Sequence, residues 1–215
     1  MSTSPRVLRA GIVLIDPETS AVQKVIALQY NPDTLSRTLQ AQGIGDSPDR
    51  SEALRLKGPP IETIRVETEI DLTDQLTPAG DAGSSGQYGL HPQLAALETV
   101  LYPASAHLIS NSVLAQTGTL EIAPMESALT LFVWSNSRII PVRLTEFAVT
   151  EEAFDSNLNP IRAKVTLGMR VLSVSDLGFQ HKGGRLFMAY QQTKERLAAM
   201  DRSSVFSTLG IAGVP

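Results

Sequence analysis

The sequence predicts a mainly β protein of the α+β class, with an antiparallel sheet, one flanking helix and a helical C-terminal extension. The side chains of residues 64–72 alternate between a largely apolar face and a charged face, which is typical of an antiparallel strand with one buried side. Residues 163–171 alternate in the same way. Elsewhere, short apolar runs joined by turn residues recur, and this pattern indicates hairpins.

The first forty residues are predicted to be β structure. The apolar residues 11–15 and 22–30 flank the turn-forming segment DPETS, which predicts a hairpin. The segment NPD at residues 31–33 ends the second strand, because proline has no N–H to donate to a ladder. We interpret residues 34–42 as a further strand, although the spacing of its two leucines suits a helix better.

The strand at residues 64–72 lies between two segments rich in glycine and proline, residues 43–60 and 73–90. Both are predicted to be long loops that order against a partner. The buried face of the strand is predicted to hold Ile64, Val66, Thr68, Ile70 and Leu72, and the solvent face Arg65, Glu67, Glu69 and Asp71.

A helix is predicted to begin at residues 91–92, because proline is favoured in the first helical turn. Its apolar stripe is formed by Leu94, Leu97 and Leu101. Residues 104–117 fit either a second short helix or a loop.

The second half of the chain returns to β structure. Residues 129–134 and 138–149 are predicted to form a hairpin around the turn SNS. In the second of these strands the buried parity switches between Leu144 and Phe147, which predicts a β-bulge. Residues 151–160 are then predicted to form a polar loop, which leads into the last strand.

The outward face of that last strand carries three basic residues, Arg162, Lys164 and Arg170. We expect them to pair across strands with acids such as Glu67 and Glu69 rather than to bind an anion. After the strand, two glycines open a final helix over residues 185–200. The predicted organisation is a β domain over residues 1–177 and a C-terminal extension, residues 178–215, made of this helix and an apolar tail.

Eight apolar residues are candidates for contacts with another subunit. Within residues 129–134, two aromatic side chains lie on the face opposite the leucines, so this strand is either buried between two layers or carries a subunit contact. Two more candidates are expected to anchor the loop at residues 151–160, and the others lie in the tail from residue 203, which we expect to dock on a neighbour. The candidates are Phe132, Trp134, Phe154, Leu158, Val205, Phe206, Leu209 and Ile211.

The composition excludes several classes of protein. The chain has 215 residues and no cysteine, which excludes disulfides, Fe–S clusters and cysteine-based zinc sites. With 18 Lys and Arg against 22 Asp and Glu, the formal net charge of −4 argues against nucleic acid as a partner. No apolar run approaches the roughly 20 residues of a membrane span, and no secretory signal is evident. We therefore expect cytoplasmic synthesis and assembly without membrane insertion.

No motif for catalysis or cofactor binding stands out. The sequence contains neither a phosphate-binding P-loop nor a nucleophile elbow. His91, His107 and His181 are far apart and show no metal-ligand spacing. We therefore expect a protein that is not an enzyme, with no catalytic residues, no cofactor and no metal.

Two alternatives from other functional classes stay open at this point. An enzyme would pair Glu67 or Glu69 with one of the glutamates at residues 151–152 across a cleft. A carbohydrate- or small-ligand-binding module would use Phe132 and Trp134, if they face outward, to stack on a sugar.

Six segments, in order along the chain, resemble the tube-type proteins of contractile injection systems. The segment QYNPDTLSR at residues 29–37 resembles the motif FNP-(E/D)-x-L of that family. The others match the family in the same order: GPPIETIRVE (58–67), HPQLAAL (91–97), LFVW (131–134), PVRLTE (141–146) and EEAFDSNLNPIRA (151–163). The resemblance covers about residues 5–175.

The resemblance implies a phage-tail-tube-like antiparallel β-barrel or sandwich whose subunits form six-fold rings. Relatives that carry this domain at the baseplate of phage-tail-like particles join the central spike to the inner tube, and they often end in a LysM domain. No LysM-sized segment follows residue 175 here, so we expect a separate LysM protein to supply that contact.

The implied partners are further copies of the chain, the spike protein, the inner-tube protein and other baseplate components, in a particle that the cell can release. The extension beyond residue 175 favours the tube-initiator or adaptor role. The main inner-tube subunit of the same particle is the alternative.

Overall fold

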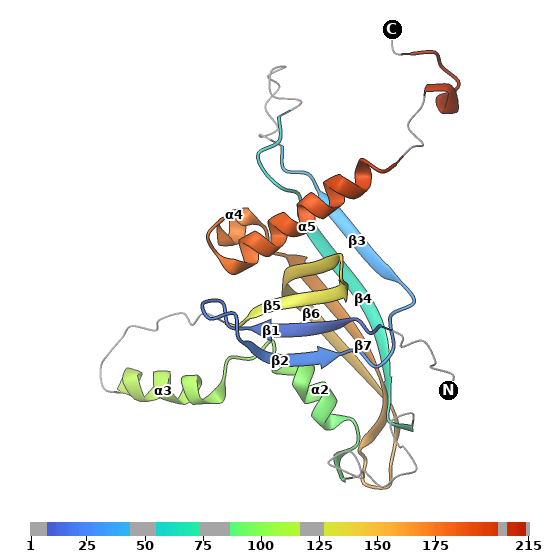
Figure 1. Cartoon of the computed structure of the whole chain (residues 1–215). Helices are drawn as coiled ribbons and strands as arrows, with labels where there is room; N and C mark the ends of the chain where they lie inside the picture. The colour runs from blue at the N-terminus through green and yellow to red at the C-terminus, as the bar shows by residue number, and fades with distance from the viewer. Residues whose placement is uncertain (1–7, 44–54, 74–86, 117–126, 202–205, 214–215) are drawn as a thin grey trace, which may run out of the picture.

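Seven strands form one antiparallel sheet in the computed structural model of the chain, which describes residues 8–43, 55–73, 87–116, 127–201 and 206–213. The strand order is β2-β1-β5-β6-β7-β4-β3 (Figure 1). The strands are β1 (Gly11–Ile15), β2 (Val22–Ala27), β3 (Leu35–Gln40), β4 (Ile61–Asp71), β5 (Leu129–Ser135), β6 (Arg138–Phe154) and β7 (Pro160–Val171). The helices are α2 (His91–Glu98), α3 (Ser105–Gln116), α4 (Val174–Leu177), α5 (Lys182–Ala198) and the 3₁₀ helix η2 (Phe206–Leu209). The predicted mainly β, α+β class is confirmed.

The three predicted strands near the N-terminus are confirmed, although β2 ends at Ala27 rather than at the predicted residue 30. Each strand has a local or tertiary cause. The turn between β1 and β2 is fixed by Asp16, whose carboxylate accepts hydrogen bonds from the amides of Glu18 and Thr19 at 3.0 and 2.7 Å. β3 forms although its leucine spacing suits a helix. Its backbone pairs with β4 from Leu35 opposite Val66 onward, and this tertiary pairing outweighs the local preference.

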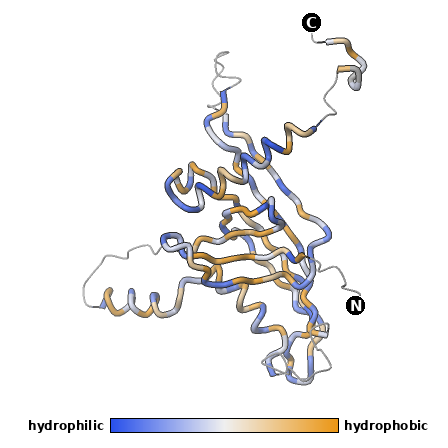
Figure 2. Tube along the Cα trace, viewed as in Figure 1, coloured by the Kyte–Doolittle hydropathy of each residue, from blue (hydrophilic) through white to orange (hydrophobic). Residues whose placement is uncertain are grey.

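The sheet bends around one hydrophobic core. β1, β2 and β5 run across the direction of β3 and β4, and β6 and β7 connect the two halves (Figure 1). The bend is accompanied by a register shift between Leu144 and Glu146 of β6, which is the predicted bulge. α2 closes one side of the core with Leu94 and Leu97. Apolar residues concentrate along β1 and β5 at the middle of the sheet (Figure 2).

Both faces of β5 are covered, so the first of the two predicted alternatives for this strand is confirmed. Phe132 is fully buried and lies opposite Ile12 of β1 in the main core. Trp134 is half-buried against the same core, with its ring centroid 6.0 Å from that of Phe132. On the other face, Leu129 and Leu131 form a second apolar cluster under α4 and α5.

The prediction of a polar loop over residues 151–160 is wrong. β6 continues to Phe154, which pairs with Pro160 at the start of β7, so the connection is a tight turn at the end of a long hairpin. Phe154 and Leu158 do not anchor this segment in their own domain either, because their side chains are 50% and 77% exposed. The β6–β7 hairpin to which they belong extends beyond the core (Figure 1).

The helices also correct details of the sequence-based predictions. Residues 105–116 are helical, which settles the alternative left open there. Leu101 is exposed rather than part of the α2 stripe, because the helix ends at Glu98. Gly183 and Gly184 lie inside the first turn of α5, where the side chain of His181 caps the helix by accepting a hydrogen bond from the amide of Gly183.

The two predicted long loops fall largely outside the described residues, which omit 44–54 and 74–86. At the end of the first loop, Gly43 and Leu56 form an isolated antiparallel bridge. At the end of the second, Leu90 is fully buried and its amide donates to the carbonyl of Pro160. The first half of α5 packs in the main core through Phe187 and Tyr190. The domain boundary placed at residue 177 stays a prediction.

Candidate interaction surfaces

The outward face of β4, β7 and β6 carries cross-strand rows of charged and hydroxyl side chains. Arg162 of β7 binds two acids of β4, with its Nε 3.1 Å from Glu69 Oε1 and its Nη2 2.8 Å from Asp71 Oδ2. Lys164 Nζ lies 2.9 Å from Glu152 Oε1. The predicted pairing is therefore confirmed for Arg162 with Glu69, whereas Lys164 pairs with β6 rather than β4.

Of two further ion pairs, the first differs from the predicted pairing and the second was not predicted. Arg170 Nη2 lies 2.6 Å from Asp176 Oδ1, just after β7. Arg65 Nη1 lies 2.7 Å from Glu146 Oε2 of β6, and its Nε is only loosely placed 4.0 Å from Glu67 Oε1. The face is thus a network of exposed ion pairs. Such pairs contribute little to the free energy of unfolding, and their main effect is to hold neighbouring strands in register.

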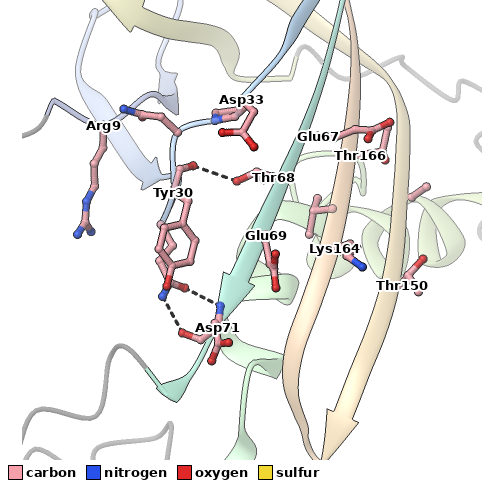
Figure 3. Close-up of a pocket in the computed structure, with 15 residues that line it drawn as sticks. Arg9, Tyr30, Asp33, Glu67, Thr68, Glu69, Asp71, Thr150, Lys164 and Thr166 are labelled. Carbon is pink, nitrogen blue, oxygen red and sulfur yellow. Dashed lines mark hydrogen bonds between the residues drawn. The ribbon is translucent and has the colours of Figure 1, made fainter.

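A hollow of about 970 Å³ opens over this face (Figure 3). Glu67, Glu69, Lys164 and Thr166 line it from the strands, and the segment 29–33 that follows β2 forms its opposite wall. In the close-up, Glu67 and Glu69 lie on the strand side, whereas Thr68 points toward Tyr30. The lining mixes acids, bases and hydroxyls with apolar side chains such as Ala148 and Val165, so the hollow does not mark a particular class of ligand.

A side-chain amide links the segment after β2 to the end of β4. Gln29 Nε2 donates to the carbonyl of Asp71 at 2.6 Å, and its Oε1 accepts from the Asp71 amide at 2.9 Å (Figure 3). Thr68 Oγ1 donates to the carbonyl of Tyr30 at 3.0 Å. These bonds join the β2 edge of the sheet to the part of β4 that extends beyond β3, and we call this junction the Gln29 seam.

Asp71 was predicted on the solvent face, but only 7% of its surface is exposed. Its carboxylate accepts hydrogen bonds from the hydroxyl and the amide of Thr73, at 2.6 and 2.8 Å. These bonds, and after them the pairing with Arg162, hold the pKa of Asp71 below its usual value. Asp71 is therefore a permanent anion at neutral pH rather than a proton donor.

The carboxylates of the enzymatic alternative do not all share one face. Glu152 lies in the row of Asp71 and Arg162, on the side of Glu67 and Glu69. Glu151 lies opposite Ala163, whose side chain points into the core, so Glu151 belongs to the other face of the hairpin. Its pairing with Glu67 or Glu69 across a cleft is therefore wrong.

A buried carboxylate, missed by the sequence analysis, anchors the C-terminal helix. Glu62 of β4 is 2% exposed and binds Arg37 of β3, with 2.7 Å between Arg37 Nη2 and Glu62 Oε1. From α5, the hydroxyl of Tyr190 donates to Glu62 Oε1 at 3.0 Å, and Lys194 Nζ lies 3.4 Å from Glu62 Oε2. Lys194 also lies over the Tyr190 ring, 4.1 Å from its centroid. We call these four residues the Glu62 cluster.

Several apolar side chains lie exposed on parts that project from the sheet. The hairpin tip, residues 153–159, exposes Phe154 and Leu158. α3 stands apart from the sheet, and all of its large apolar side chains are exposed (Figure 1). Beyond α5, Phe206 and Ile211 of the predicted docking tail are 50% and 46% exposed. The other two tail candidates, Val205 and the side chain of Leu209, lie outside the described residues.

Two other kinds of site are not found in the described part of the chain. Among these residues, no group of three or more His, Asp or Glu side chains is arranged to hold a metal ion. None of the helices in the described ranges is long and apolar enough to cross a bilayer.

Comparison with models of known protein families finds no match to the sequence, and comparison with curated proteins finds no relative.

Proposed function

We propose that this chain is a structural subunit of a contractile injection system. In this proposal, six copies form a ring at the baseplate, and the ring joins the central spike to the inner tube and initiates tube assembly. The observation that carries the proposal is the exposure of apolar side chains on three separate projections of a folded chain: the hairpin tip, α3 and the segment after α5. Surfaces of this kind fit contacts with other subunits.

The shape of the sheet supports a tube-like barrel. The sheet bends so that its β2 edge approaches β4, and the Gln29 seam bridges the gap with side-chain hydrogen bonds. Within the described residues, β2 and β3 each have a strand partner on one side only. Their remaining edges offer backbone groups to a neighbouring subunit.

The C-terminal extension supports an adaptor rather than a main tube subunit. The Glu62 cluster fixes α5 on the β3–β4 hairpin, so the helix leaves the domain in a defined direction. Leu197 in its last turn and Met200 just after its end are both exposed, on the side of the chain that leads to the apolar tail. A fixed arm of this kind suits a contact with a second protein at one end of a ring.

The test is the position of the protein in a particle. A tagged chain is produced at its natural level in the cells that encode it, and the material that it carries is examined by mass spectrometry and negative-stain microscopy. Co-purification with sheath, tube and spike proteins, with label at one end of a rod, is the expected result. Label along the whole rod would make the chain the main inner-tube subunit. Recovery without any particle would overturn both roles.

The carbohydrate-binding alternative loses the observation on which it depended. Phe132 is fully buried and Trp134 faces the same core, so the pair forms no outward platform for a sugar ring. No other described aromatic pair replaces it. That the chain is not an enzyme stays a prediction.

A further inference from the structure

We propose that the hairpin tip of one copy docks into the groove between β2 and α2 of a second copy of this chain. The inference rests on the proposed function, because it takes another copy as the partner, and it deepens that function by naming the contact. It joins two surfaces that both lie open in a single chain and differ in charge.

The hairpin tip is a rigid apolar projection. The carboxylate of Asp155 accepts hydrogen bonds from the amides of Asn157 and Asn159, at 2.7 and 2.9 Å, and from Asn159 Nδ2 at 2.9 Å. This turn holds Leu158 at a φ of 63°, in the left-handed region, with its side chain 77% exposed beside Phe154. Because the turn is already ordered, docking would lose little conformational entropy.

The groove has a volume of about 710 Å³ and lies between the β2 edge and α2. Ile26 and Ala96 contribute apolar surface, which suits an apolar tip. Its charged residues are both basic: Arg9 at one end, and Lys24, whose Nζ lies 3.4 Å from the carbonyl of Ala96. No acid lines it.

The tip has the opposite charge. Residues 144–161 contain four acids and neither lysine nor arginine. Glu146 and Glu152 are paired with Arg65 and Lys164. Asp155 makes the tip acidic, and Glu151 adds a second negative charge just before it in β6. An acidic apolar tip and a basic apolar groove are complementary in both respects, and complementary charge favours this pairing over tip-to-tip or groove-to-groove contacts.

The tip and the groove are fixed relative to each other within one copy. Asn159 Nδ2 donates to the carbonyl of Gln87 at 3.2 Å, and the Leu90 amide donates to the carbonyl of Pro160 at 3.0 Å, immediately before α2. α2 is one wall of the groove. Each contact would therefore repeat the same rotation between neighbours, which is the head-to-tail geometry from which rings are built.

Disulfide trapping tests the contact, since the chain has no cysteine of its own. One full-length variant carries Leu158→Cys at the tip, and a second carries Ala96→Cys in the groove. Equimolar mixtures are oxidised at high protein concentration, and the cross-linked dimer is measured on non-reducing gels. The matched control replaces the second variant with Gln192→Cys, an exposed position on α5. Oxidation of each variant alone is measured in parallel.

A disulfide that forms in the Leu158→Cys and Ala96→Cys mixture, but not with the control, is the expected result. Equal cross-linking with the control, no cross-linking, or a predominant Leu158→Cys homodimer would overturn the contact.

A Leu158→Asn variant, whose asparagine tolerates the left-handed backbone, is expected to lose incorporation into particles. Incorporation at the wild-type level would overturn the contact and leave the proposed function intact. If the wild-type chain enters no particle, the proposed function fails, and the disulfide result still decides the contact.

Discussion

The hydroxyl of Tyr190 lies 3.0 Å from a carboxylate oxygen of Glu62, and both side chains are almost completely buried. The two residues are 128 positions apart in the sequence, so the bond joins the C-terminal helix to the first half of the sheet. Arg37 and Lys194 complete the charge balance around the carboxylate. Removal of one member takes a hydrogen-bond or ion-pair partner from a buried group, and such a loss costs more than the bond itself contributes.

Tyr190→Phe is expected to lower the free energy of unfolding by about 2 kcal/mol, because it removes a hydrogen bond to a buried charged group. Denaturant unfolding would measure the change. Phe187 shares the same core but has no polar group, so a Phe187→Leu variant is the control for packing alone. An unchanged midpoint in Tyr190→Phe would contradict the role given to the Glu62 cluster.

The same tyrosine should titrate at high pH. Burial, and after it the charge of Glu62, raises the pKa of Tyr190 to about 12 from its ordinary value of 10.0. The folded state therefore holds the proton more tightly than the unfolded state. The contribution of the protonated Tyr190 hydroxyl to stability is complete at pH values below its pKa in the unfolded state. This contribution is lost as the pH rises through its pKa in the folded state. Phenolate absorbance of the wild type minus that of Tyr190→Phe should show a transition well above that of an exposed tyrosine.

Thr73→Val is expected to destabilise the protein by about 1 kcal/mol at neutral pH, because Asp71 loses a hydrogen-bond donor. The pKa of Asp71 is lowered in the folded state, so this contribution is present above the unfolded pKa and is lost as pH falls through the folded pKa. Unfolding measured across the acid range should show the difference between variant and wild type disappearing at low pH. Thr150→Val, an exposed change on the same face, should show no such pH dependence.

Gly184→Ala should destabilise the protein although alanine favours a helix by about 1 kcal/mol over glycine. A Cβ at position 184 would overlap the carbonyl oxygen of Gly178, where the connection from α4 crosses the first turn of α5. The backbone must move to relieve the overlap, so we expect a net loss of about 2 kcal/mol. Gly213→Ala is the control, since nothing lies within 4 Å of its added carbon. Thermal unfolding of both variants would measure the loss of stability that each substitution causes.

Phe132→Ala should be the most damaging single truncation in β5, with a loss of about 4 kcal/mol from cavity formation in the core. Trp134→Ala should cost less, because its ring is half-buried at the margin of the same core. Calorimetry or denaturant unfolding of the two variants measures the order. A larger loss for Trp134→Ala would contradict the burial assigned to this strand.

The parts of the fold that were predictable have a local signal. The alternation of apolar and polar side chains predicts β4 and β7, and the parity switch between Leu144 and Phe147 predicts the bulge. No local signal predicts which face of β5 buries Phe132, because both faces of the strand are apolar. The packing of α4 and α5 determines which layer covers each face. Glu62 has the parity of the buried face of β4, which is a detectable signal. Its partners come from distant segments, and no local pattern identifies them.

The Gln29 seam differs from the strand ladders of the sheet, because a rotatable side chain takes the place of a peptide group there. Strand ladders separate only when several backbone hydrogen bonds break together, whereas the seam includes the two bonds of the Gln29 amide and the bond from Thr68 to the Tyr30 carbonyl. The bent sheet can therefore open locally at the seam while its strand ladders stay paired. Hydrogen exchange of the Asp71 amide would therefore follow the opening of the seam, on a faster timescale than that of the amides paired between β6 and β7.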